Sequence, residues 1–146
     1  VPVLLAAVLI FGDYIQIPFT FERIMLSLLA LIMAFVINFL LGNTFSLISF
    51  FVQQIIGLRT FYEHAVIFLS GEGIPLTAYP SWILFYINLM PFRYTLSFPI
   101  EILMGTISGA KVFEGFVIAS IWILILIIVY KLLFRYALKN NEAYGG

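Results

Sequence analysis

Residues 24–58 form a run of thirty-five positions without a charged side chain, and residues 116–130 form a second, shorter run of this kind. A charged side chain is costly in hydrocarbon, and lipid offers no hydrogen-bond partner to an unpaired backbone amide. A helix of about 20 apolar residues satisfies both constraints and crosses a bilayer. We therefore expect this chain to fold within a membrane.

The composition agrees with a membrane protein and excludes several functions. Hydrophobic residues make up 64% of the chain and charged residues 10%, against about 25% charged residues in soluble domains. Seven basic and seven acidic side chains cancel, so we expect no nucleic-acid surface. The lack of cysteine excludes disulfides and thiolate metal sites, and one histidine cannot build a two-histidine metal site. We expect no catalytic residue, metal site or cofactor in this chain.

The apolar runs predict an all-α, polytopic membrane bundle of about four spans, with residues 1–146 as a single transmembrane domain. As one straight helix, residues 24–58 would measure about 52 Å, whereas a hydrocarbon core is about 30 Å thick. We therefore expect a break within residues 50–58, where Gln53, Gln54 and Gly57 interrupt the apolar pattern. The other expected segments are a partial first span at 1–12, a loop at 13–23, a third span at 55–70 and a last span at 112–134.

Four prolines divide residues 75–109 into pieces that are too short to cross a bilayer. The two apolar pieces, residues 81–90 and 92–104, would reach only about 15–20 Å as helices. We expect a re-entrant hairpin on the outer side, because irregular backbone is tolerated at membrane depth only where protein or water covers it. Gly105 and Gly109 form a GxxxG pair, which we interpret as a turn rather than a helix–helix contact.

Basic residues indicate an orientation. Lys131, Arg135 and Lys139 accompany the end of the last span at intervals of four, and Arg59 follows the expected break. Because basic residues are retained on the cytoplasmic side, we expect the C-terminus and the break in the cytoplasm, and the hairpin outside.

Asn38, Asn43, Ser46 and Ser49 are polar positions in the long apolar run. Their spacing brings some of them near one helical face, where they could line a translocation path or bond to a neighbouring helix. Packing between helices is the commoner role for such residues, and a translocation path is the functional hypothesis.

Glu101 is a candidate gate residue, because an unpaired carboxylate in the apolar hairpin would be costly. If the chain reverses between Tyr94 and Pro99, Arg93 faces Glu101 across the bend. We predict that Glu101 has a basic or backbone-amide partner and steadies an outer gate. A favourable position in the first turn of a helix is the structural alternative.

Arg59, Glu63 and His64 gather at the start of the third expected span. Glu63 and His64 could act as a proton relay, since ionisable groups within spans are often functional. The interpretation that we favour is a cytoplasmic interface, where these side chains are solvated.

Several segments, taken in order, carry a resemblance to a known family. They are FLSGEGIPLTAYP at residues 68–80, LMPFRY at 89–94 and FPIEILMG at 98–105, followed by RYALK at 135–139 and YGG at 144–146. In this order they resemble the C-terminal half of the transmembrane subunit of type-2 ATP-binding-cassette (ABC) exporter permeases.

The resemblance implies a subunit of six spans, of which this chain would supply the end of the third to the sixth. It implies a second copy of the permease or a homologous permease as partner, and a separate ATPase subunit that binds ATP and magnesium. It also implies a multi-pass protein of the bacterial inner membrane that exports an unknown substrate.

Two alternative functions stay open. An ion channel or ion-coupled carrier would also use broken helices, as selectivity elements. A membrane scaffold without transport is the other alternative.

Overall fold

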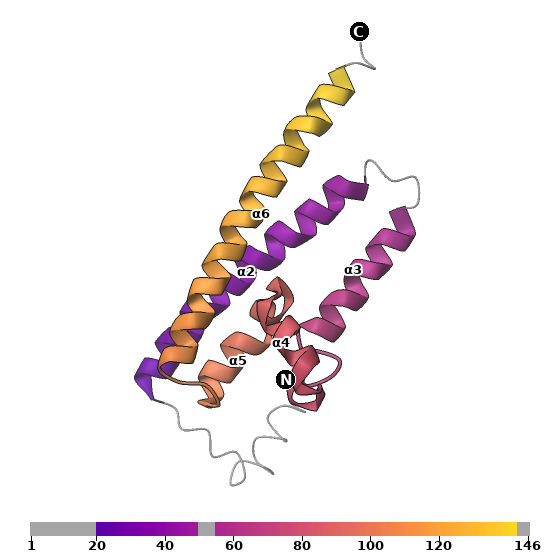
Figure 1. Ribbon diagram of the computed structural model, residues 1–146. Helices are drawn as coiled ribbons and strands as arrows, with labels where there is room; N and C mark the ends of the chain where they lie inside the picture. Colours follow the sequence, from indigo (N-terminus) through magenta and orange to yellow (C-terminus); the bar gives the residue numbers. More distant parts are fainter. Residues whose placement is uncertain (1–19, 50–54, 143–146) are drawn as a thin grey trace, which may run out of the picture.

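The computed structural model describes residues 20–49 and 55–142, and every regular element within them is helical (Figure 1). In chain order these elements are α2 (Phe21–Ser49), α3 (Ile55–Leu69), the 3₁₀ helix η1 (Leu76–Ala78), α4 (Ser81–Leu89), the 3₁₀ helix η2 (Pro91–Thr95), α5 (Ser97–Met104) and α6 (Ala110–Glu142). The predicted all-α class is confirmed.

Two helices are long and apolar enough to cross a membrane. They cover Phe21–Ile48 and Ala110–Lys139, and the most apolar 18-residue window of each has a mean hydropathy of 2.7. Only 33% and 22% of their most apolar windows are buried, so many large apolar side chains remain exposed. Soluble proteins rarely expose apolar surface on this scale, whereas a lipid-facing helix does so by necessity.

α2 and α6 begin at the same end of the molecule and pack against each other (Figure 1). Ala30 of α2 and Ala119 of α6 are buried in the core, together with Ile37 and Leu126. Small side chains let two helix backbones approach closely, which is a main source of packing energy between helices in lipid. The contact between α2 and α6 is therefore the main helix–helix packing of the domain.

α3 runs back alongside α2 (Figure 1). The rings of Phe45 and Tyr62 pack against each other, with centroids 4.5 Å apart. The long uncharged run is thus divided between two separate helices, as its length predicts. Gln53 and Gln54, at the expected break, lie outside the described residues, as do the expected partial span at 1–12 and most of the loop at 13–23.

The segment between α3 and α6 packs against the first half of α2. Ser27 Oγ donates a buried hydrogen bond of 2.9 Å to the Pro99 carbonyl oxygen. Ser97 Oγ donates another, of 2.5 Å, to the Ser70 carbonyl oxygen at the end of α3. α4 and α5 have nine and eight residues, so both are as short as the prolines predict. Their re-entrant placement in a membrane stays a prediction.

Two helices extend beyond the spans expected from the sequence. α2 begins at Phe21 rather than residue 24, and Glu22 in its first turn interacts favourably with the helix dipole. α6 extends from Ala110 to Glu142, well beyond the expected end at residue 134. Its last turns are polar but contain neither proline nor glycine, and lysine and arginine are good helix formers.

Residues 92–104 do not form one helix, because Leu96 separates η2 from α5 with φ −143° and ψ −59°, within the stretch where the chain was expected to reverse. Pro99 explains the division. Its ring would clash with the carbonyl of Thr95 in a continuous helix, whereas a proline in the first turn of a new helix gives up no intrahelical hydrogen bond.

Gly105 and Gly109 lie in the connection between α5 and α6, and both have positive φ angles, 70° and 55°. Gly105 ends α5 in the left-handed conformation that glycine adopts without a Cβ penalty. The interpretation of this pair as a turn is confirmed.

Candidate functional site

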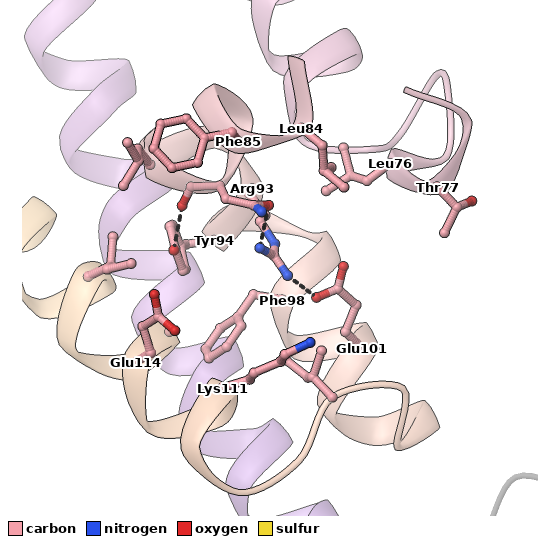
Figure 2. A pocket seen from close by; sticks show the side chains of 15 residues that line it. Leu76, Thr77, Leu84, Phe85, Arg93, Tyr94, Phe98, Glu101, Lys111 and Glu114 are labelled. Atoms are coloured by element: carbon pink, nitrogen blue, oxygen red, sulfur yellow. Dashed lines mark hydrogen bonds and ion pairs between the residues drawn. The ribbon is translucent and has the colours of Figure 1, made fainter. Parts of the chain in front are cut away.

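A pocket of about 360 Å³ lies between the segment 75–109 and the first turns of α6 (Figure 2). Its walls combine apolar, aromatic and charged side chains. They are Leu76 and Thr77 of η1; Leu84, Phe85, Asn88 and Leu89 of α4; Arg93 and Tyr94 of η2; Phe98 and Glu101 of α5; Ile107 of the following turn; and Lys111, Glu114, Gly115 and Ile118 of α6.

Arg93 and Glu101 form an ion pair across the pocket, with Nη2 and Oε2 2.5 Å apart (Figure 2). Arg93 Nη1 also donates to Asn88 Oδ1, at 2.5 Å. The two charged side chains are only 17% and 24% exposed, so each needs a partner. The predicted basic partner of Glu101 is confirmed, whereas its role at a gate stays a prediction.

Local chain geometry brings this pair together. η2 carries Arg93, α5 carries Glu101, and the turn at Leu96 lies between them. The sequence places a proline at the start of η2 and another in the first turn of α5. Together these restrictions favour the chain reversal that places the two charges face to face.

Tyr94 is hydrogen-bonded to Asn88, the residue that also accepts a hydrogen bond from Arg93. It is 2% exposed, and its hydroxyl donates a hydrogen bond of 2.7 Å to the Asn88 carbonyl oxygen. Burial raises the pKa of Tyr94 to about 12; Arg93 opposes this effect, and Glu114 and Glu101 add to it. The hydroxyl therefore remains protonated and continues to donate at all physiological pH values.

Lys111 and Glu114 lie on the α6 wall of the pocket (Figure 2). Both side chains are exposed, and they stand three residues apart on one helical face. Neither Lys111 nor Glu114 was singled out from the sequence as a site residue. Two opposite charges in the first turns of an otherwise apolar span were the signal that could have identified them.

Trp122 fixes the position of the α4 wall. Its Nε1 donates a hydrogen bond of 2.7 Å to the Leu89 carbonyl oxygen, at the end of α4. Carbonyls at a helix end lack an intrahelical partner, so this contact satisfies one of them and ties α4 to α6. The sequence gives no indication of this contact, since its two residues are 33 positions apart.

The polar residues of α2 lie away from this pocket. Asn43 Nδ2 donates to the Phe39 carbonyl oxygen at 2.7 Å, and Ser46 Oγ donates to that of Gly42 at 2.8 Å. Asn38 Oδ1 accepts from the Tyr62 hydroxyl of α3, at 3.4 Å. None of these residues lines the pocket with Glu101, so the structure separates the candidate path residues into two groups. The side chain of Ser49 is not among those that the structure describes.

The polar group of α3 interacts within its own helix. Arg59 Nε and Glu63 Oε1 form an exposed ion pair of 2.8 Å, and His64 Nδ1 lies 2.7 Å from the Thr60 carbonyl oxygen. Glu63 and His64 thus have different partners, and the cytoplasmic interface and the proton relay both stay hypotheses. Within residues 20–49 and 55–142, no three His, Cys, Asp or Glu side chains come together as a metal site would require.

Comparison with known proteins gives one result. The sequence matches the family model described as ABC-2 family transporter protein over residues 1–145. Neither the curated proteins nor the solved structures give a match.

Proposed function

The chain belongs to the ABC-2 transporter family, as a membrane subunit whose transport is energised by a partner ATPase, and on this premise we propose that it is an exporter permease with its charged pocket at the outer gate. α2, α3 and α6 are its spans in this proposal. The segment 75–109 is a re-entrant unit at the outer face, and the C-terminus lies in the cytoplasm of a bacterial cell.

The observation that carries the proposal is the distribution of charge along α6. Lys111 and Glu114 lie at its start, beside the Arg93–Glu101 pair, and Lys131 begins the basic series near its other end. Lys111 and Lys131 are twenty residues apart, which is about 30 Å of helix and equals the thickness of a hydrocarbon core. The basic end fits the cytoplasmic side, so the pocket lies at the outer boundary.

We propose that two such subunits, identical or homologous, surround a central path. Asn38, Asn43 and Ser46 belong to α2 and are at most partly buried within one subunit. The side chains of Asn43 and Ser46 donate hydrogen bonds to backbone carbonyl oxygens of their own helix. They could therefore face a path without leaving a side-chain donor unsatisfied. Arg59, Glu63 and His64 would lie at the cytoplasmic interface, on the side where the ATPase binds ATP and magnesium.

The test is co-purification followed by reconstitution. The full-length protein should purify with an ATPase subunit that carries a Walker motif, and the complex in proteoliposomes should hydrolyse ATP. The matched control is the same preparation without that ATPase. Ion currents through the permease alone in a planar bilayer would instead indicate a channel and would overturn the proposal.

A further inference from the structure

The pocket lies at headgroup depth if α6 spans the membrane as proposed above. The apolar part of α6 lies between Lys111 and Lys131, so Lys111 and Glu114 mark one boundary of the hydrocarbon. Large apolar side chains next to the pocket are exposed, among them Phe85 on α4 and Phe113 and Val117 on α6. A purely aqueous vestibule would not be flanked by such residues, whereas acyl chains would cover them.

The charges of the pocket are balanced, but they are not all paired. Arg93 and Glu101 neutralise each other at 2.5 Å. Within the described part of the chain, Lys111 and Glu114 form no hydrogen bond or ion pair with another side chain. One cationic and one anionic group thus remain available, side by side on one face of α6.

We propose that this pocket binds the headgroup of a zwitterionic phospholipid from the adjacent leaflet. Lys111 holds the phosphate and Glu114 holds the ammonium group. The volume of about 360 Å³ is near the lower end of the range for ligand sites, about 300–1,000 Å³, so it accepts a headgroup and leaves the acyl chains in the bilayer. An anionic lipid fits less well, because sites for such lipids carry clusters of unpaired basic residues.

The test measures lipid binding to the full-length transporter, purified with its ATPase and delipidated, by native mass spectrometry without ATP. The probes are phosphatidylethanolamine, phosphatidylcholine and phosphatidylglycerol at equal concentrations. We expect phosphatidylethanolamine to be retained roughly tenfold better than phosphatidylglycerol, the difference that one additional charge-assisted hydrogen bond gives. Phosphatidylcholine, whose quaternary ammonium has no N–H to donate, gains only the ionic attraction to Glu114 and should fall between the two. Because no transport is measured, this result is independent of the exporter proposal.

Two variants assign the site. Glu114→Gln leaves Lys111 as the unpaired charge, so the preference should reverse toward phosphatidylglycerol. Lys111→Gln removes the phosphate partner and should weaken retention of all three lipids. Lys131→Gln, at the other end of α6, is the matched control and should keep the preference of the unmodified protein.

Three results would overturn the proposal. One is equal retention of the three lipids by the unmodified protein, and another is an unchanged preference in Glu114→Gln. The third is dissociation of the permease pair in Lys111→Gln with lipid retention intact, which would assign the pocket to contact with a second subunit.

Discussion

The ring of Phe98 rests on the backbone of Gly115, so closely that a Cβ on residue 115 would lie 2.1 Å from Cε2 of the ring. Phe98 belongs to α5 and Gly115 to the first turns of α6, and the ring also packs edge-on against Phe116 at 5.4 Å between centroids. The absence of one side chain thus sets the distance between the short helices and the last span.

We predict that Gly115→Ala destabilises the protein. A methyl group cannot enter without displacing the fully buried Phe98, and overpacking of this kind costs about 1–3 kcal/mol. The measurement is the thermal unfolding midpoint of the full-length protein in detergent.

Gly42→Ala is the matched control for this prediction. It lies within α2, and nothing is found within 4 Å of an added Cβ. Its unfolding midpoint should be unchanged or higher, because alanine favours the helix by about 0.5–1 kcal/mol. Equal midpoints for the two variants would contradict the packing described here.

The Arg93–Glu101 pair predicts a defined double-mutant cycle. Glu101→Gln leaves Arg93 partly buried without its carboxylate, and stranding such a group costs about 1–3 kcal/mol. Adding Arg93→Gln removes the stranded charge, so the double variant should lose less than the sum of the two single variants. Unfolding midpoints of all four proteins, and ATP hydrolysis by their complexes with the ATPase in proteoliposomes, complete the cycle. Additive losses would show that the pair contributes no coupling energy.

Tyr94 predicts a loss of stability at high pH. Its pKa is raised to about 12, against about 10 for an unfolded tyrosine. A raised pKa means that the folded state holds the proton more tightly, so this stabilisation is complete below pH about 10 and is lost as the pH rises toward about 12. The measurement is the difference in unfolding midpoint between the unmodified protein and Tyr94→Phe from pH 9 to pH 12. A constant difference over this range would disprove the contribution of Tyr94.

Cysteine labelling tests the orientation. The 146 residues contain no cysteine, so a single introduced thiol reports on its own position within them. Thr77→Cys, at the exposed edge of the pocket, should react with an impermeant maleimide in intact cells. Gln53→Cys and Gln54→Cys should react only after the cytoplasmic side is opened. Labelling of the glutamine positions from outside alone would invert the topology.

Local rules were sufficient for much of the fold. The lack of charge at residues 24–58 predicts two helices rather than one, and the prolines predict the short lengths of α4 and α5. The Arg93–Glu101 pair was also predictable, because a charge in an apolar segment needs a partner and the nearest basic residue lies across a bend.

The pocket itself could not be predicted from the sequence. It requires α4 to lie against α6, and that position depends on contacts such as Trp122 with Leu89 and Phe98 with Gly115, which join residues far apart in the chain. Sequence patterns within one helix carry no information on such contacts. The charges of Lys111 and Glu114 at the start of an apolar span are visible in the sequence, but the pocket wall that they share exists only after the short helices have packed.

α6 has a mechanical consequence because it continues without interruption through its 33 residues. It contains no proline, and its single glycine is held beneath Phe98, so it offers no hinge. A rod of this length measures about 50 Å, and a tilt of about ten degrees around its centre moves each tip by about 4 Å. If α6 tilts in this way, a displacement of its C-terminal end, which carries Lys131, Arg135 and Lys139, moves its N-terminal end by a similar distance in the opposite direction. The N-terminal end carries Lys111 and Glu114, so the pocket wall moves with it.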